Sequence, residues 1–321
     1  MNTRMLGKNG PEITEIGLGS WAMGGPWVFG WGEQDDAASV KTIRRAADLG
    51  INWIDTAPVY GLGHGEKVVA EALKDRRKDV LIATKCGLIW DANGRVDRNN
   101  RPESIRRECE ASLRRLDTDV IDLYQIHWPD RNVPVEDSWG EMTRLKEEGK
   151  VRSIGVSNFD VELLARCQKI APVQSLQPPY SMINREVEAE ILPWCREHNV
   201  GVIAYSPLQN GLLTGKFSRD FLQTLPEDDW RRRHGHGFFK EPLFDKALEF
   251  VEFIRPIAQH YDKTAAQLAI AWVLMQPGIT AAIAGARNVD QVEQNIDEAG
   301  WRISGKDIEQ IEKIYEEIFS K

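Results

Sequence analysis

Short apolar runs rich in β-branched residues alternate along the chain with longer segments whose apolar residues recur three and four positions apart. The short runs predict strands at residues 15–18, 51–54, 80–83, 120–126, 151–156, 173–176, 201–204 and 280–283. The longer segments predict helices at residues 35–49, 66–74, 101–116, 135–148, 160–169, 186–198 and 264–275. Strands that alternate with helices pair in parallel, and eight such units favour a closed (β/α)₈ TIM barrel. An open, doubly wound sheet is the alternative.

Several segments fall outside these eight units. Residues 4–6 and 13–16 flank an Asn9-Gly10 pair, a strong turn signal that predicts an N-terminal β-hairpin capping the bottom of the barrel. Residues 206–243 are too long for an ordinary connection, and long loops in compact folds are usually functional, so we expect a lid there. The remaining periodic segments predict extra C-terminal helices at residues 246–260 and 304–319.

The composition narrows the possible partners. The chain has 41 Lys and Arg against 49 Asp and Glu, a formal net charge of −8. Nucleic acids and anionic membranes attract concentrated positive charge, so we expect neither as a main partner. No apolar stretch is long enough for a secretory signal or a membrane span, which predicts a cytoplasmic protein, and no linker interrupts the single domain expected over residues 1–321. No CxxC pair occurs, so we expect reduced, structural thiols at Cys86, Cys109, Cys167 and Cys195.

Polar side chains stand at the ends of the predicted strands, where barrel enzymes place their chemistry. The second to seventh strands are followed by Asp55, Lys85, His127, Ser157-Asn158, Gln177 and Tyr205-Ser206. Tyr60 lies in the loop after Asp55. Any one such residue is more often solvent-facing than catalytic. Asp55, Lys85 and His127, however, end three consecutive strands, so their carboxylate, amine and imidazole groups should meet at the same end of the barrel.

Three kinds of chemistry are candidates for this set. A metal site is not favoured, because one carboxylate and one histidine fall short of the usual three or four ligands. A Schiff base on Lys85 needs a lowered amine pKa, whereas Asp55 would keep this lysine charged. Carbonyl reduction fits best. The charge of Lys85 would lower the pKa of Tyr60, which gives a proton to the carbonyl oxygen while His127 orients or polarises it.

Hydride transfer needs a bound cofactor, and two glycine-containing segments are candidates for its site. Residues 17–22 match GxGxxA, but Gly24-Gly25-Pro26 follow where a dinucleotide fingerprint requires a helix. Residues 284–288 follow the last strand and precede a helix predicted over residues 289–299, where barrel enzymes often bind phosphate. Arg287 adds a bidentate donor. The second segment is therefore the better phosphate site.

Seven motifs give the chain a resemblance to the aldo-keto reductase family. They are GlyLeuGlySerTrp (17–21), AsnTrpIleAspThrAlaProValTyrGly (52–61), AlaThrLys (83–85), AspLeuTyrGlnIleHisTrpPro (122–129), GlyLysValArgSerIleGlyValSerAsnPhe (149–159), AlaTyrSerProLeu (204–208) and GlyLeuLeuThrGlyLys (211–216). The resemblance covers essentially the whole chain in order. It implies a TIM barrel that reversibly reduces aldehydes or ketones to alcohols with NADPH/NADP⁺. The chain is more similar to bacterial inositol-associated and general stress members and to potassium channel β-subunits than to the aldose reductase branch.

The resemblance implies a role for each matching residue. The catalytic tetrad corresponds to Asp55, Tyr60, Lys85 and His127, with Tyr60 as proton donor. The nicotinamide carboxamide is held by residues matching Ser157, Asn158 and Gln177, and the nicotinamide ring stacks on the match of Tyr205. The loop over the pyrophosphate is matched by Ser206, Pro207, Leu208, Gly211 and Lys216. The adenosine phosphate site is matched by Gly285, Ala286, Arg287, Gln291 and Asn295. We also expect the cofactor beside Gly19, Ser20, Trp21 and Asp55, and the substrate beside Trp21, Tyr60, His127 and Trp128.

Finer properties follow from the same comparison. Arg287 favours NADPH over NADH through the 2′-phosphate. We expect a monomer or weak homo-oligomer acting on a small carbonyl or sugar-type substrate. One alternative is an NADP(H)-binding regulatory or redox-sensing subunit, since the channel β-subunits resemble this chain and keep the tetrad. A second alternative is a Schiff-base aldolase that acts through Lys85.

Two further groups of residues are interpreted without a function. Arg231, Arg232 and Arg233 beside His234 and His236 are read as a solvated loop tip rather than a metal or phosphate site. The apolar surroundings of Trp53 and Trp272 predict that both pack in the core.

Overall fold

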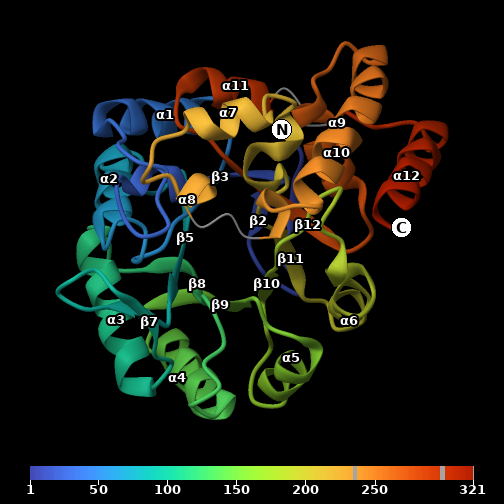
Figure 1. Cartoon of the computed structure of the whole chain (residues 1–321). Coiled ribbons are helices and arrows are strands. Elements are labelled where there is room, and N and C mark those ends of the chain that lie inside the picture. Colours follow the sequence, from blue (N-terminus) through green and yellow to red (C-terminus); the bar gives the residue numbers. More distant parts are fainter. Residues whose placement is uncertain (234–236, 297–300, 321) are drawn as a thin grey trace.

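The computed structural model describes residues 1–233, 237–296 and 301–320. Its centre is a closed barrel of parallel strands in the order β10-β11-β12-β3-β4-β5-β8-β9 (Figure 1). These strands are β3 (Ile16–Gly19), β4 (Trp53–Asp55), β5 (Leu81–Cys86), β8 (Ile121–Ile126), β9 (Val151–Ser157), β10 (Ser175–Gln177), β11 (Gly201–Ala204) and β12 (Ile279–Gly285). Each overlaps one of the eight predicted runs, so the TIM barrel is confirmed and the open sheet is wrong.

Helices form a ring around the barrel (Figure 1). They are α1 (Asp36–Asp48), α2 (His64–Leu73), α3 (Pro102–Arg115), α4 (Val135–Glu147), α5 (Val161–Gln168), α6 (Ile191–Glu197), α10 (Ala265–Met275) and α11 (Val289–Ile296). The helix predicted over residues 186–198 is instead a short 3₁₀ turn, η2 (Glu186–Glu188), followed by α6. Pro193 explains the break, because proline is tolerated in the first turn of a helix but not in its interior. The end of the helix predicted over residues 289–299 lies outside the described residues.

The N-terminal hairpin closes one end of the barrel. Strands β1 (Thr3–Met5) and β2 (Glu12–Thr14) pair in antiparallel fashion, which confirms the prediction. Leu6 follows β1 and Ile13 lies within β2, and both are buried in a cluster that contains side chains from the barrel strands. The end of the barrel opposite the carboxyl ends of its strands is therefore filled with apolar side chains.

The predicted C-terminal helices are present as α9 (Leu243–His260) and α12 (Gly305–Phe319), which pack against each other. Ser304 caps α12, since its hydroxyl accepts a hydrogen bond from the backbone N–H of Asp307. Across the ranges that the structure describes, no helix is both long and apolar enough to cross a membrane.

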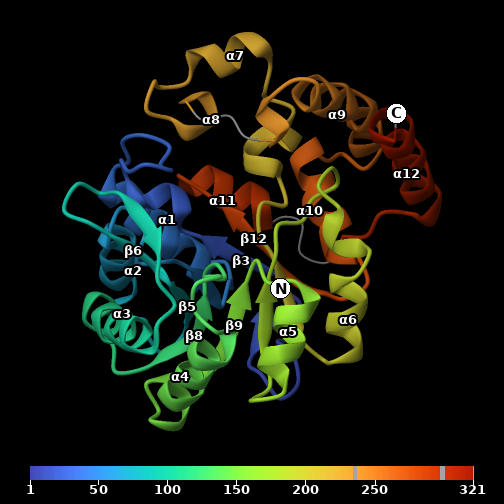
Figure 2. The ribbon, with the colours of Figure 1, turned by 60° about the horizontal axis from the view of Figure 1, so that its bottom comes forward.

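Two further elements lie near the mouth of the barrel. The first was predicted as a lid, and the second was not predicted. The lid segment, residues 206–243 and called the strap below, contains η3 (Gln209–Thr214), α7 (Arg219–Thr224), α8 (Trp230–Arg233) and η4 (Gly237–Phe239). Figure 2 shows α7 and α8 on the side toward which the arrow of β9 points. The second element is an antiparallel ribbon of β6 (Leu88–Trp90) and β7 (Val96–Arg98), which follows β5. Both elements therefore lie at the carboxyl ends of the strands.

Gly17 makes room for the largest side chain of the barrel floor. A methyl group on Gly17 would overlap the indole ring of Trp53, which is buried and donates a 2.9 Å hydrogen bond to the carbonyl of Thr14. We expect Gly17→Ala to lower the free energy of unfolding by about 1–3 kcal/mol, the usual cost of an overpacked core. Denaturant unfolding measures this loss. Gly305→Ala is the control, because a methyl group there meets no neighbour within 4 Å; an equal loss in both variants would contradict the explanation.

Candidate active site

The interior of the barrel changes from apolar to polar between two successive layers. One buried apolar cluster contains Trp53, Ala83 and Leu123 from three neighbouring strands. Residues two positions apart on a strand point to the same side, so the next layer holds Asp55, Lys85 and Gln125. All three are buried. A polar layer thus rests on an apolar floor at the carboxyl ends of the strands.

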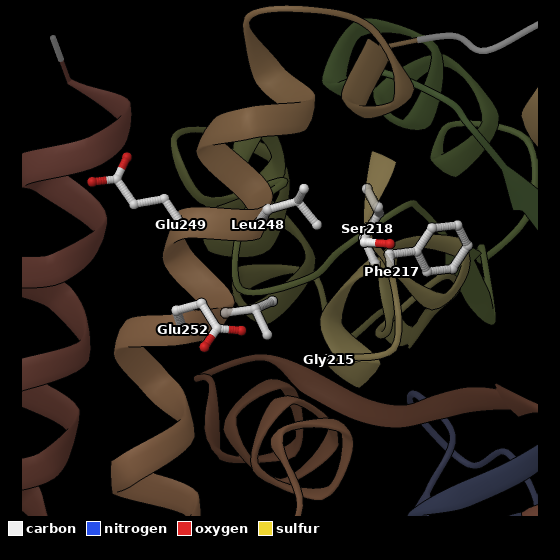
Figure 3. Close-up of a pocket in the computed structure, with 8 residues that line it drawn as sticks. Gly215, Phe217, Ser218, Leu248, Glu249 and Glu252 are labelled. Carbon is white, nitrogen blue, oxygen red and sulfur yellow. The ribbon is translucent and has the colours of Figure 1, made fainter. Parts of the chain in front are cut away.

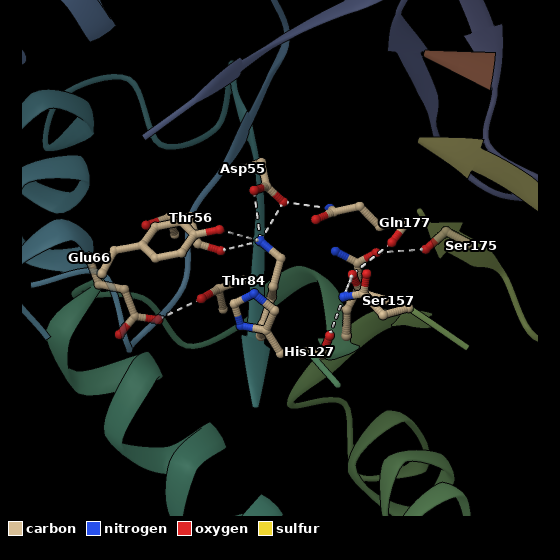
Figure 4. A network of polar contacts seen from close by, with 12 residues as sticks. Asp55, Thr56, Glu66, Thr84, His127, Ser157, Ser175 and Gln177 are labelled. Carbon is tan, nitrogen blue, oxygen red and sulfur yellow. Dashed lines mark hydrogen bonds and ion pairs between the residues drawn. The ribbon is translucent and has the colours of Figure 1, made fainter. Parts of the chain in front are cut away.

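A buried ion pair is the centre of this layer. The Nζ of Lys85 donates to both carboxylate oxygens of Asp55, at 2.7 and 2.8 Å, and to the carbonyl of Thr56 at 2.9 Å. Burial lowers the pKa of Lys85, while the charge of Asp55 opposes this shift. Figure 4 shows the carboxylate of Asp55 within this network of polar contacts. An ammonium that donates to three oxygens has no lone pair available for a Schiff base, so the aldolase alternative is not favoured.

Tyr60 and His127 complete a cluster of four functional side chains. The turn after β4 brings the hydroxyl of Tyr60 to 3.4 Å from the Nζ of Lys85. The Tyr60 and His127 rings meet edge to face, with centroids 6.0 Å apart. Both side chains are buried. The structure therefore brings together the four residues that the strand ends and the family resemblance pointed to.

Burial dominates the proton affinity of these groups. It raises the pKa of Tyr60 well above its usual value, and the charge of Asp55 adds to the shift. The expectation of a lowered pKa for Tyr60 is wrong in this structure, because burial and the charge of Asp55 outweigh the charge of Lys85 across their 3.4 Å contact. Burial and then Lys85 lower the pKa of His127 well below its usual value. At neutral pH Tyr60 therefore keeps its proton, and His127 is a neutral imidazole with one N–H donor.

The residues expected at the nicotinamide form one hydrogen-bonded group beside the ion pair. The side chain of Asn158 donates to the His127 carbonyl at 2.9 Å and to the Ser157 hydroxyl at 3.0 Å, and it accepts from the Tyr205 hydroxyl at 2.9 Å. Ser157 in turn donates to the Gln177 carbonyl at 2.7 Å. The amide of Gln177 donates to Asp55 at 2.8 Å, as Figure 4 shows. These polar groups thus lie within one network that ends on Asp55.

The residues expected to bind phosphate lie where β12 meets α11. Gly285 ends the strand, and its carbonyl accepts from Asn295 at 3.2 Å. Gln291 accepts from the backbone N–H of Arg287 at 2.7 Å. The guanidinium of Arg287 donates to the side chain of Gln34 at 2.8 Å and to the carbonyl of Glu33 at 2.6 Å. Ala286 is buried, whereas Gly285 is exposed and Arg287 is partly exposed.

Two expected cofactor residues come from the first barrel strand. Gly19 pairs with both Asp55 and Gly285 across neighbouring strands. The backbone N–H of Ser20 donates to the carbonyl of Asp55 at 2.9 Å. This strand end therefore connects the ion pair to the phosphate loop.

The strap supplies the remaining expected cofactor residues. Ser206 has a positive φ of 55°, and Pro207 and Leu208 follow it into η3. Gly211 also needs a positive φ, of 100°, and a methyl group there would press on Phe217. Lys216 is exposed. The strap thus begins with a tight turn directly after Tyr205 and leaves the Lys216 ammonium accessible.

Arg231 corrects the interpretation of the loop tip. Its side chain is buried, donates to Asp229 at 2.9 and 2.5 Å, and lies 4.1 Å over the ring of Trp31. Burial, followed by the charge of Arg231, lowers the pKa of Arg287, and the charge of Asp229 opposes this shift. Arg232 and Arg233 are more exposed, and His234 and His236 lie outside the described residues. Arg231 therefore fastens the strap across the mouth, which no spacing in the sequence indicated.

An aromatic wall covers Tyr60 on the substrate side. The rings of Trp21 and Trp27 lie 5.2 and 6.0 Å from the Tyr60 ring. Leu88 and Val96 of the β6–β7 ribbon pack on the same cluster. The sequence places Trp27 in a loop at the barrel mouth but does not assign it to the substrate, because this glycine- and proline-rich loop has no periodicity.

Trp128 follows His127 and lies under the guanidinium of Arg98, 5.1 Å from its ring. Trp53 and Trp272 are both buried, which confirms that they pack in the core.

The four cysteines are free and buried, as expected. Burial also raises the pKa of Cys86, so this thiol beside Lys85 is kept protonated.

A cavity of about 290 Å³ lies between the strap and α9 (Figure 3). Its lining includes Phe217, Leu248 and Glu252. A second cavity of about 400 Å³ lies beside α4 and α5. Neither cavity is lined by Asp55, Tyr60, Lys85 or His127.

A profile of the Aldo/keto reductase family matches residues 15–316. The chain belongs to this family. Its activity is accordingly the reduction of carbonyl groups with a nicotinamide cofactor. Among relatives, it is 39% identical to the aldo-keto reductase YhdN of Bacillus subtilis, over 100% of this chain and 95% of the relative. It is 35% identical to an NADH-specific methylglyoxal reductase of Escherichia coli, over 94% of each chain.

Solved structures of this aldo-keto reductase family share the fold. The glycerol dehydrogenase AKR11B4 from Gluconobacter oxydans superimposes with a TM-score of 0.89 and 40% identity, covering 99% of this chain and 96% of that one. An aldo/keto reductase from Klebsiella pneumoniae in complex with NADP and acetate has a TM-score of 0.75 and 29% identity, covering 98% and 96%. The arrangement of strands and helices is therefore that of known carbonyl reductases.

Proposed function

We propose that this aldo-keto reductase reduces aldehydes and ketones with NADPH and that Tyr60 is its proton donor. The observation that carries the proposal is the buried contact of Tyr60 with the Lys85–Asp55 ion pair beside a neutral His127. When bound, the cofactor supplies hydride to the carbonyl carbon. Tyr60 then gives its proton to the carbonyl oxygen, which would otherwise carry the developing negative charge.

The neighbours of Tyr60 have separate roles in this proposal. The ammonium of Lys85 stabilises the phenolate that forms when Tyr60 loses its proton. Asp55 holds that ammonium with two hydrogen bonds, and Gln177 holds Asp55 with a third. The N–H of the neutral His127 imidazole is suited to donate to the carbonyl oxygen and orient it. Proton transfer thus needs no exposed charged residue.

The residues that would hold the cofactor fit a nicotinamide dinucleotide. Ser157, Asn158 and Gln177 offer amide and hydroxyl groups to a carboxamide, and Tyr205 offers a ring. At the other end Arg287 brings a positive charge to the backbone that begins α11, which suits phosphate groups, whereas the charge of Arg231 is paired with Asp229. The NADP complex of the Klebsiella pneumoniae relative supports NADPH, whereas the Escherichia coli relative is NADH-specific. We therefore base the NADPH assignment on Arg287.

Arg287→Gln tests this assignment. The variant loses a charged donor to the 2′-phosphate, so we expect kcat/KM with NADPH to fall by about 10- to 100-fold, the effect of one charge-assisted hydrogen bond. Values with NADH should change little, because NADH lacks that phosphate. Steady-state rates with both cofactors measure the ratio. Arg45→Gln, which removes an exposed partner of Glu293, is the control. Equal losses with NADPH and NADH would contradict a role in selecting the phosphate.

The aromatic wall favours substrates with an apolar or aromatic substituent. Trp21, Trp27, Leu88 and Val96 surround Tyr60, whereas a sugar needs many convergent polar groups. We therefore propose compact aldehydes and ketones, with aryl aldehydes preferred over aldoses. Loss of NADPH absorbance with benzaldehyde, methylglyoxal and an aldopentose tests both the activity and the preference. Tight NADPH binding without turnover of any carbonyl would instead support the regulatory alternative.

A further inference from the structure

Glu108 is a titratable side chain behind the site, and it has no part in the mechanism above. It lies on α3 and is half-buried, with its carboxyl directed toward the end of β5. One carboxyl oxygen accepts from the backbone N–H of Gly87 at 2.9 Å. The other accepts from the Ser104 hydroxyl at 3.1 Å. Glu108 therefore holds the chain two residues after Lys85.

The peptide group that Glu108 holds also holds His127. The carbonyl of Cys86 belongs to the same Cys86–Gly87 peptide and accepts from the backbone N–H of His127 at 2.9 Å. Hydrogen bonds in such a chain polarise one another, so a stronger bond at Gly87 strengthens the bond at His127. One peptide therefore connects the Glu108 carboxyl to the backbone of His127, with Lys85 on the adjoining strand end.

The turn at Gly87 is shaped for this arrangement. Gly87 has a φ of +86°, and a methyl group there would overlap the side-chain oxygen of Asn100. The amide of Asn100 donates to the carbonyl of Trp128 at 2.8 Å, one residue beyond His127. Glu108 thus holds the exit of β5 by a hydrogen bond to Gly87, and Asn100 packs against Gly87 while its amide holds the exit of β8.

The charge of Glu108 changes near neutral pH. Burial raises its pKa to about 7, and the bonds from Gly87 and Ser104 and the charges of Arg115 and Arg107 on the same helix oppose the rise. The titratable groups that face it from β5 and β8 are Cys86 and Tyr124, and burial keeps both neutral. Arg115 is already paired with Glu66 of α2. Of Glu108, Cys86 and Tyr124, it is therefore Glu108 whose charge changes near neutral pH.

We propose that Glu108 is a positioning residue which, as a carboxylate, holds the Cys86–Gly87 peptide and through it fixes Lys85 and His127 for proton transfer. This inference rests on the proposed roles of those two residues. A carboxylate accepts a stronger hydrogen bond than a carboxylic acid. Below pH 7 the protonated side chain therefore binds the Gly87 N–H less firmly, and His127 is less fixed.

Glu108→Gln gives the first test, because the amide is equal in size and cannot be ionised. For the wild type we expect kcat for carbonyl reduction to fall about fivefold between pH 8 and pH 6, the effect of weakening one charge-assisted hydrogen bond. The Gln variant should show the low value at both pH values, with NADPH affinity unchanged. Glu110→Gln on the same helix is the matched control, since Glu110 pairs with Lys150 at the surface. It should keep the wild-type profile.

Ser104→Ala provides a second test that leaves Glu108 in place. The variant loses a hydrogen bond that favours the carboxylate, so the step in kcat should move to higher pH. The ring signals of His127, assigned by comparison with His127→Asn, should shift near pH 7 in the wild type without cofactor and stay constant in Glu108→Gln. A wild-type profile or an unchanged His127 titration in Glu108→Gln would overturn the inference. Full activity of Tyr60→Phe would instead overturn the proposed function.

Discussion

Replacing Tyr60 by phenylalanine is expected to lower kcat by about 10²- to 10⁴-fold, the usual contribution of a general acid. The variant loses only the hydroxyl, which lies 3.4 Å from the Nζ of Lys85. The ring still fills its place between Trp21 and His127. We therefore expect NADPH to bind with nearly unchanged affinity, because Ser157, Gln177 and Arg287, which are expected to hold it, lie on or directly after other strands. Single-turnover kinetics and NADPH fluorescence titration measure the two effects.

A matched control for this variant is Tyr315→Phe on α12. This residue loses the same hydroxyl, but its ring lies against Arg185, away from the barrel mouth. Its kcat should equal that of the wild type. Loss of both turnover and NADPH binding in Tyr60→Phe would contradict the assignment of Tyr60 as the proton donor, because it would indicate a damaged cofactor site.

Asp55→Asn is expected to lower the free energy of unfolding by about 3–5 kcal/mol, because it leaves the buried ammonium of Lys85 without its counter-charge. Lys85 has no exposed surface, so water cannot replace the carboxylate. The same change should reduce kcat strongly, since a neutral or displaced Lys85 cannot stabilise the Tyr60 phenolate. Urea unfolding and steady-state kinetics measure the two losses.

The double variant Asp55→Asn/Lys85→Met separates stability from chemistry. It removes both charges, and buried ion pairs can often be replaced by apolar residues at little cost in stability. We expect most of the lost stability to return while kcat stays low. Recovery of activity together with stability would show that the ion pair only supports the fold.

The residues that end the barrel strands could be predicted because period-two strands and parallel pairing are properties of local sequence. Asp55, Lys85 and His127 come directly from that pattern. The direction of the Tyr60 pKa could not be predicted, because it depends on how completely Trp21 and Trp27 cover the ring. That cover exists only after the loops have folded.

Other features near the mouth depend on contacts between distant segments. The ribbon of β6 and β7 has strands of three residues each, too short for a visible alternation. Arg231 stands in an arginine run that is typical of a solvated surface, and its burial depends on Trp31, which lies two hundred positions earlier in the chain. Neither the segment around Arg231 nor the segment around Trp31 contains a sequence pattern that predicts this contact. The strap was therefore predicted as a lid, but its fastening was not.

The apolar cluster that contains Leu6 and Ile13 closes one end of the barrel. The dinucleotide and the carbonyl compound must then use the same opening, the one that the strap crosses. We expect the nicotinamide to lie deep, against Tyr205, with the carbonyl compound above it. The dinucleotide should therefore bind before the carbonyl compound and leave after the alcohol, once the contact of Arg231 with Trp31 has opened.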